Sequence, residues 1–250
     1  MNLAEVKRQL DQELEQIHAH EFITADPIKI PKRFTLKQDI EIASFFASIL
    51  AWGQRITIIN NTNKLMHWMG EEPYNFILHY KANDLKPFES FVHRTFNSTD
   101  CLYFISRLRD FYLEQDSLEH FFEGNTMKER IANFHVHFFK TDFAPARTRK
   151  HIANPAKGSS AKRLNMFLRW MVRSDDIDFG LWKTIKPSEL KCPLDVHVQR
   201  AAMQFGLLNR KQQDWKAVEE LSNNLVQLDI NDPIKYDLAL FKWSERRAKA

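Results

Sequence analysis

Hydrophobic residues recur three and four positions apart along most of the chain, which is the spacing typical of amphipathic α-helices. Asn2 and Glu5 have the spacing of a capping box at a helix start, and Thr35 with Gln38 repeats it. The periodicity predicts helices over about 2–17, 35–52, 55–69, 74–80, 84–97, 99–113, 116–122, 126–139, 160–173, 195–206, 213–228 and 233–247. Three further stretches are predicted to be loops: 25–33, 141–160 and 174–194, of which the last is predicted to be polar.

Composition supports a helical protein and excludes several other classes. Only 6 of the 250 residues are glycine, whereas β-sandwiches and α/β folds need many tight turns. The most apolar stretch, residues 43–52, has half of the roughly 20 residues that a membrane span needs. The N-terminus is charged and lacks the apolar core of a secretory signal. We therefore expect an all-α protein with no membrane partner, located in the cytoplasm.

The positive charge is concentrated in one segment. The chain as a whole is net +4, but residues 1–139 are net −4 and residues 174–250 are neutral. The segment between them, residues 140–173, is net +8 and is called the basic segment below. Such a local excess of cations is expected where a protein binds a polyanion, most simply a nucleic acid. Its nine cations are Lys140, Arg147, Arg149, Lys150, Lys157, Lys162, Arg163, Arg169 and Arg173.

The helix predicted within the basic segment has two opposite faces. Apolar residues from Leu164 to Met171 recur at i, i+3, i+4 and i+7, so they share one face. Lys162, Arg169 and Arg173 fall on the other face. This basic face is either an ordinary solvated surface or a phosphate-binding surface. The cations upstream of the helix favour phosphate binding.

The turn before this helix is a second candidate for phosphate binding. Lys157, Gly158 and Ser159 precede the predicted helix start. Backbone N–H groups at a helix start bind phosphate readily.

Asp195 stands at the start of the predicted helix over 195–206. Taken alone, it reads as an ordinary N-cap, whose side chain stabilises a helix by about 1 kcal/mol. A catalytic carboxylate can also occupy this position, because the positive end of the helix keeps it ionised. Both interpretations remain open from the residue itself.

No pattern of metal or cluster ligands is present, and we expect no metal and no cofactor. His135 and His137 are two residues apart, as are His18 and His20, and residues two apart on a helix do not face each other. The two cysteines, Cys101 and Cys192, are too few for a four-cysteine zinc site or an iron–sulfur cluster.

Two segments resemble the helix-hairpin-helix (HhH-GPD) DNA glycosylase superfamily. One is residues 157–173 with Lys162, and the other is the pattern Asp195-x-His197-x-x-Arg200. In that superfamily a hairpin precedes the helix with the catalytic lysine, and Asp-x-His-x-x-Arg opens the next helix. Within it, the pattern is most similar to a bacterial family of unknown function that is related to archaeal 8-oxoguanine DNA glycosylases.

Two other stretches carry a weaker resemblance. The turn Gly53-Gln54-Arg55 looks like the turn whose glutamine fills the gap left by a flipped base. The tail from Asp232 to Phe241 resembles the closing helix of the same family.

The resemblance implies a single helical domain over residues 1–250, with two lobes, a cleft between them and a hairpin core at about 150–210. It implies a DNA repair enzyme, a glycosylase with AP-lyase activity that excises an oxidised purine such as 8-oxoguanine. Lys162 would attack the sugar and Asp195 would act as its carboxylate partner. The base would enter a pocket that includes Trp52, Gln54 and Trp170. The expected contacts to the DNA backbone are Arg147, Arg149, Lys150, Lys157, Gly158, Ser159, Arg163, Arg169, Arg173, His197 and Arg200.

The hairpin differs from the superfamily pattern, and this keeps an alternative open. The usual hairpin has two glycines that flank one residue just before the lysine, whereas only Gly158 stands before Lys162 here. The alternative is a non-catalytic helix-hairpin-helix protein that binds nucleic acid. A protein-interaction scaffold would leave the charge of the basic segment unexplained.

Overall fold

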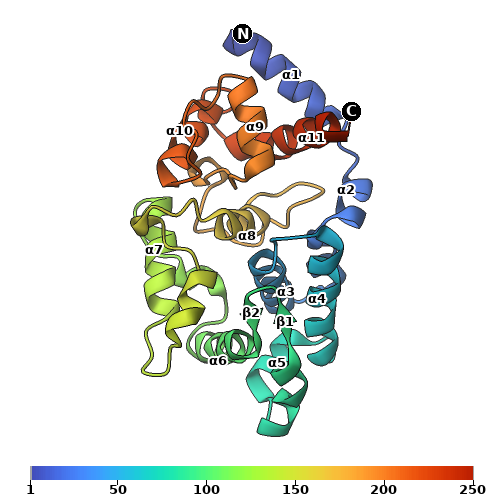
Figure 1. Cartoon of the computed structure of the whole chain (residues 1–250), viewed down its shortest axis with the longest axis vertical. Coiled ribbons are helices and arrows are strands. Elements are labelled where there is room, and N and C mark those ends of the chain that lie inside the picture. Colours follow the sequence, from blue (N-terminus) through green and yellow to red (C-terminus); the bar gives the residue numbers. More distant parts are fainter. Residues whose placement is uncertain (1, 250) are drawn as a thin grey trace. The chain divides into compact units, whose positions relative to one another are not determined.

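The structure, a computed structural model, describes residues 2–249, which are mostly helical, as expected for an all-α protein (Figure 1). The described strands are β1 (Val92–His93) and β2 (Phe96–Asn97), which form one antiparallel hairpin. The α-helices are α1 (Leu3–Glu15), α2 (Ala19–Ala25), α3 (Lys37–Ile49), α4 (Arg55–Trp68), α5 (Pro73–His79), α6 (Ser98–Glu114), α7 (Met127–Phe138), α8 (Lys162–Val172), α9 (Val196–Gln204), α10 (Trp215–Val226) and α11 (Tyr236–Lys249). Short 3-10 helices occupy Pro27–Lys29, Pro31–Arg33, Ala82–Ser90, Leu118–Phe121, Ala146–His151, Pro155–Lys157, Pro187–Glu189 and Pro233–Lys235.

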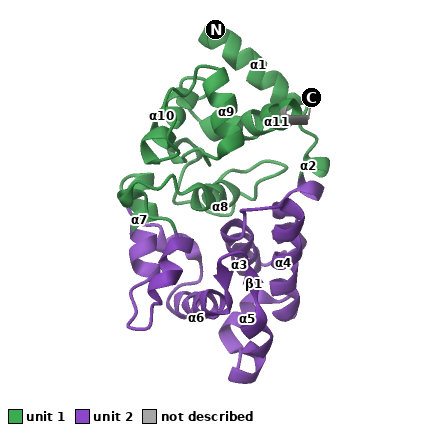
Figure 2. Cartoon of the chain, viewed as in Figure 1, with its two compact units in different colours: residues 1–22, 125–132, 153–250 green, residues 23–124, 133–152 purple. Residues whose placement is uncertain are grey.

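The chain divides into two compact units, each built from segments that are separate in sequence (Figure 2). Unit 1 contains residues 1–22, 125–132 and 153–250, and unit 2 contains residues 23–124 and 133–152. The candidate catalytic residues and α8 to α11 belong to unit 1. The β-hairpin and α3 to α6 belong to unit 2.

Unit 2 is built around α3, which is buried on all sides between residues 40 and 49. Phe45 of α3 stacks on Phe104 of α6 at a centroid distance of 5.7 Å, and phenylalanines of α7 complete this aromatic cluster. The carboxylate of Glu41 in α3 is fully buried and accepts hydrogen bonds from Tyr112 Oη at 2.8 Å and from the backbone N–H of Leu118 at 3.0 Å. The many phenylalanines of the sequence therefore fill the core.

Unit 1 is built around α8 and α11. The apolar face predicted for α8 is confirmed, because Leu164, Phe167, Leu168 and Met171 are all fully buried. Helix α11 packs along both α9 and α1 (Figure 1). These contacts hold the start of α9, where Asp195 lies, against the same core as α8.

The structure corrects three of the sequence predictions. The segment predicted as a helix over 84–97 is a 3-10 helix followed by the β-hairpin, because Pro87 lacks the N–H that a helix interior needs. The N-cap of α3 is Leu36 with no side-chain bond, so the capping box expected at Thr35 does not form. The loop over 174–194 is not polar throughout, since residues 177, 182, 185 and 190 are buried apolar side chains.

The remaining helix predictions agree with the structure to within a few residues. Asn2 caps α1 through a hydrogen bond from the backbone N–H of Glu5 at 2.8 Å, which is one half of the predicted capping box. The Glu5 carboxylate accepts instead from Arg8 and Gln9. Among residues 2–249, no helix has the length and apolar character required to cross a membrane.

Candidate functional site

Lys162 and Asp195 lie close together in unit 1. The Lys162 Nζ is 3.9 Å from Asp195 Oδ2, and the two side chains are 26% and 24% exposed. Asp195 is the N-cap of α9, and its other oxygen, Oδ1, accepts the backbone N–H groups of His197 and Val198 at 2.9 and 3.0 Å. The two interpretations of Asp195 are therefore compatible, because one oxygen caps the helix while the other faces the lysine.

The backbone before Lys162 turns twice through the left-handed region. Gly158 has a φ of +89° and ends the 3-10 helix Pro155–Lys157, and Ala161 has a φ of +48°. Ala161 is the N-cap of α8 and has no side-chain bond to the helix. Lys162 is thus the first residue of α8, at the end where backbone N–H groups lack helical acceptors and can bind an anion.

The structure corrects the interpretation of Arg169 and Arg173 as surface contacts to a backbone. Both are 4% exposed, and both donate to Asp178, which is 2% exposed. Arg173 also donates to both oxygens of Asp232 at 2.8 and 2.9 Å, and Arg169 donates to Asp237. The face of α8 opposite the apolar stripe is therefore covered by the carboxylates of this buried ionic cluster.

Burial raises the pKa of two acids of the cluster, Asp178 and Asp237. It raises the pKa of Asp178 to about 6, although the nearby charges of Arg169 and Arg173 act in the opposite direction. Burial also raises the pKa of Asp237, again against the effect of Arg169. A buried carboxylate of this kind depends on its arginine partners to remain charged.

This cluster gives a stability prediction. We expect Arg173→Gln to lower the free energy of unfolding by about 3–5 kcal/mol, because it leaves Asp178 buried without its main partner. Urea unfolding followed by circular dichroism measures this change. Lys186→Gln, which removes an exposed cation of unit 1, is the matched control and should change stability by less than about 0.5 kcal/mol. An Arg173→Gln protein as stable as the control would contradict the buried cluster.

Asp237, which was not among the residues predicted from the sequence, lies close to the candidate pair. The charges of Asp195 and Lys162 both act on the pKa of Asp237, the first raising it and the second lowering it. The thiol of Cys192 donates to Asp237 Oδ1 at 3.6 Å. The signal that could have found Asp237 is a lone carboxylate inside the apolar run Tyr236-Asp-Leu-Ala-Leu, where a charge is expected only with a partner.

The residues expected in a base pocket fall in different units. Trp52 and Gln54 belong to unit 2, where Trp52 is half-buried and Gln54 is the exposed N-cap of α4. Trp170 belongs to unit 1 and is wholly buried. Its side chain therefore fills the core, and the expectation that it lines an open pocket is wrong.

The β-hairpin contributes a residue that the sequence analysis missed. Arg94, at the hairpin turn, has a φ of +56° and places its guanidinium 4.8 Å from the centre of the Trp52 ring. Gly53, at φ +101°, permits this contact, because a Cβ there would come within 2.9 Å of Arg94 Nη1. One face of Trp52 is thus covered by an arginine, and a base that stacks on this face has to displace it.

The other residues expected to contact a DNA backbone differ in exposure. Arg147 donates to buried Asp100 at 2.7 Å and to the carbonyl oxygen of Thr95 at 3.0 Å, so its charge is largely compensated. Burial lowers the pKa of Arg163 to about 10, which leaves this half-buried side chain charged at neutral pH. His197 is half-buried with its ring 5.7 Å from that of Phe241, and Ser159 accepts from the Ala161 N–H. The exposed members are Arg147, Arg149, Lys150, Lys157, Gly158 and Arg200.

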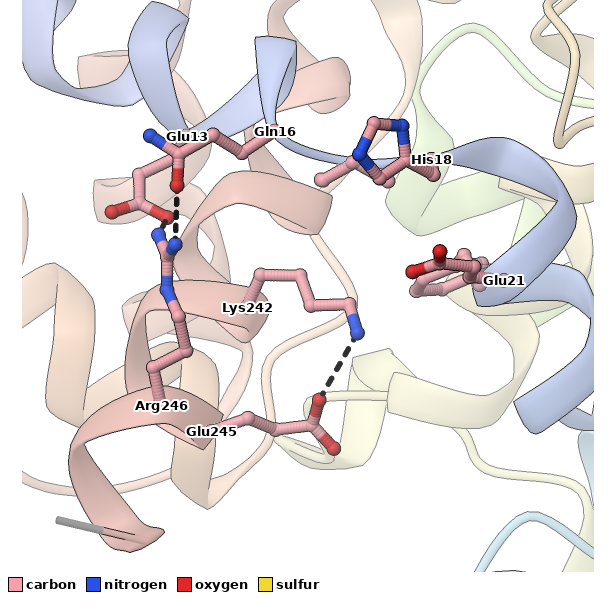
Figure 3. Close-up of a pocket in the computed structure, with 9 residues that line it drawn as sticks. Glu13, Gln16, His18, Glu21, Lys242, Glu245 and Arg246 are labelled. Atoms are coloured by element: carbon pink, nitrogen blue, oxygen red, sulfur yellow. Dashed lines mark hydrogen bonds and ion pairs between the residues drawn. The ribbon is translucent and has the colours of Figure 1, made fainter.

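A separate pocket of about 190 Å³ lies in unit 1 near α1 and α11 (Figure 3). Lys242 and Glu245 form an ion pair at 3.5 Å on one side of it, and Arg246 pairs with Glu13. It includes neither Lys162 nor Asp195. Because its charges compensate one another, we do not assign it to the candidate site.

No group of three or more His, Cys, Asp or Glu side chains in the described part of the chain has the geometry of a metal site. His135 is a core residue whose Nδ1 lies 2.7 Å from the carbonyl oxygen of Ile152. Cys101 and Cys192 are both buried, and they belong to different units.

Comparison with known proteins identifies a family. The profile of the family described as "Protein of unknown function (DUF2400)" matches residues 26–246, which is most of the chain. No curated protein and no solved structure matched the sequence. The match includes Lys162, Asp195 and the buried ionic cluster, so these features lie within the region that defines the family.

Proposed function

We propose that this chain, which belongs to the DUF2400 family, is a DNA N-glycosylase with AP-lyase activity that excises an oxidised purine such as 8-oxoguanine. The observation that supports this function is the Lys162–Asp195 pair, an amine and a carboxylate 3.9 Å apart and both open to solvent. The resemblance of the sequence to the HhH-GPD superfamily, with a two-lobed fold and a cleft for DNA, is part of the same proposal.

Lys162 is the nucleophile in this mechanism. Its neutral amine attacks C1′ of the damaged nucleotide, and the bond from C1′ to the base nitrogen breaks. The base leaves with the electron pair and takes up a proton. Opening of the sugar then gives a Schiff base between Lys162 and C1′, the intermediate expected of a lysine nucleophile with a carbonyl carbon. Loss of a proton from C2′ expels the 3′ phosphate, and water releases Lys162.

Asp195 has two roles in the same steps. Its Oδ2 accepts the proton that the Lys162 nitrogen loses as it bonds to C1′, which is general base catalysis. Its negative charge also opposes the positive charge that develops on the sugar in the transition state. The two backbone N–H bonds to Oδ1 fix the orientation of the carboxylate, so that Oδ2 remains directed at the lysine.

The turn before α8 is the part of unit 1 that we assign to the DNA backbone. The uncapped start of α8 offers backbone N–H groups, and the exposed Lys157 adds a positive charge beside them. The N–H of Gly158 already donates to the carbonyl oxygen of Pro155 at 3.0 Å. Arg169 and Arg173 have no such role in the proposal, because their charges are used within the buried ionic cluster. The base would have to be flipped out of the stack to reach Lys162.

A panel of duplexes tests this function. The chain should release base from an 8-oxoguanine duplex and cut an abasic duplex, and it should leave an undamaged duplex intact. Failure on every lesion, with binding to the duplexes retained, would favour the alternative of a nucleic-acid-binding protein that does not excise. The observation behind that alternative is the hairpin, where Ala161 rather than a glycine takes the left-handed conformation before Lys162.

A further inference from the structure

The loop between α9 and α10, residues 205–214, is held in one conformation by side chains of unit 1. The Gln199 amide donates to the carbonyl oxygens of Arg210 and Lys211 at 3.3 and 2.8 Å. At the preceding residue, Glu220 Oε1 accepts the backbone N–H of Asn209 at 2.7 Å. These contacts place the loop before any ligand binds, which reduces the entropy lost on binding.

This loop is joined to the turn that precedes α8. The backbone N–H of Trp215 donates to the carbonyl oxygen of Gly158 at 3.0 Å, and Ser159 and Asp214 form an isolated antiparallel bridge. Lys157 directly precedes Gly158 in the sequence, and Lys216 directly follows Trp215. The α9–α10 loop and the turn that we assign to the DNA backbone are therefore neighbouring parts of one surface.

The lysines of this surface are available to a ligand. Lys157, Lys211 and Lys216 are exposed, and none of them forms an ion pair with a carboxylate in the part of the chain that the structure describes. Arg210, by contrast, is paired with Asp214 at 2.7 Å. Charge counting along the sequence does not reveal these lysines, because nearby acids balance them in the total for residues 174–250.

The loop and the start of α10 border an open groove. Lys211 and Lys216 line an open groove of about 620 Å³ together with Asn209 and Gln212. The groove also includes the carboxylate of Glu220, which is occupied by hydrogen bonds from Asn209. At Gly158 a Cβ would meet nothing within 4 Å, so the backbone there is open to a close approach.

We propose that the α9–α10 loop and the first turn of α10 form a second binding element for the DNA backbone, in which Lys211 and Lys216 contact phosphates beside those held at the start of α8. The choice of DNA as the partner rests on the proposed function, whereas the surface itself follows from the contacts above. Phosphate contacts of this kind position a duplex and carry no sequence information. The cations that unit 1 offers to DNA are then supplied by Lys157, Lys211 and Lys216 rather than by the buried face of α8.

The test measures the salt dependence of binding. A labelled duplex with an uncleavable abasic analogue is titrated with the full chain at several salt concentrations, and anisotropy reports binding. Lys211→Gln/Lys216→Gln should reduce the slope of log K against log salt by about 1.8 and weaken binding about 60-fold at 0.1 M salt. The matched control is Lys86→Gln/Lys128→Gln, which removes two exposed lysines outside this surface and should change affinity by less than twofold.

The outcomes separate this inference from the proposed activity. A double variant that binds like the control, with its helical circular dichroism unchanged, would overturn the role of the loop. A wild-type chain that binds no duplex would overturn it as well. If the wild-type chain shows the predicted salt slope but neither excises a damaged base nor forms a covalent adduct with abasic DNA, only the glycosylase proposal is overturned.

Discussion

Replacing Lys162 with glutamine should abolish covalent trapping of the chain on abasic DNA by borohydride. The reagent reduces the Schiff base to a stable amine, and the glutamine side chain cannot form a Schiff base. Duplex binding should fall by no more than about tenfold, because the substitution removes a single positive charge. Trapping is measured as a shifted band on a denaturing gel, and binding is measured by anisotropy.

Lys157→Gln is the matched control for this result. Lys157 is five residues earlier, is exposed, and carries the same charge. Its removal should weaken binding modestly and leave trapping at saturating DNA in place. Retention of trapping in the Lys162→Gln variant would mean that another amine is the nucleophile, and Lys157 would be the next to test.

Replacing Asp195 with asparagine should slow base excision by about 10²- to 10⁴-fold, as is typical for the loss of a general base. Stability should change little, because asparagine caps a helix about as well as aspartate does. Single-turnover excision on an 8-oxoguanine duplex measures the rate, and thermal unfolding measures the stability. The expected result is therefore an inactive protein with an intact α9.

Asp195→Ala separates the two roles of this side chain. It should lose excision to the same extent as the asparagine variant, and it should also lose about 1 kcal/mol of stability with the cap. An Asp195→Asn variant with wild-type excision would leave helix capping as the only role of this residue. Loss of stability in both variants would show that the cap needs the charge and not only a hydrogen-bond acceptor.

The helices were predictable because their apolar faces are local in sequence. The periodicity of residues 99–113 and 126–139 identified α6 and α7 almost to their ends. The segment 82–97 was not predictable in this way, because its phenylalanines are spaced as in a helix while Pro87 and the turn at Arg94 prevent one. The conformation of this segment is determined by its packing against the core of unit 2 and not by the spacing of its own apolar residues.

The buried ionic cluster shows where a helical wheel fails. A helical wheel places Lys162, Arg169 and Arg173 on one face of α8, and it therefore predicts the same solvent exposure for all three. In the structure only Lys162 remains open to solvent, because Asp178, Asp232 and Asp237 cover the other two. Asp237 follows Arg169 by 68 residues, and only the tertiary fold brings the two together.

Lys162 and Asp195 could be predicted as a pair from the sequence motif that they share with a known superfamily. Their residue types alone did not predict a catalytic role. The spacing around Lys162 and Asp195 suggested their roles by resemblance, whereas the residues alone were compatible with a solvated lysine and a helix cap. The structure adds the distance between them and the division of labour between the two carboxylate oxygens. Arg94 could not be inferred from sequence, since its contact with Trp52 depends on a hairpin that the periodicity did not predict.

The most direct test of the central claim is to identify the residue that carries the DNA. The wild-type chain is trapped with borohydride on an abasic duplex, digested with nuclease and protease, and analysed by mass spectrometry for the modified peptide. The proposal predicts one modified residue, Lys162, with the deoxyribose remnant on Nζ. An adduct on a different lysine or on the N-terminal amine, or no adduct at all, would contradict it.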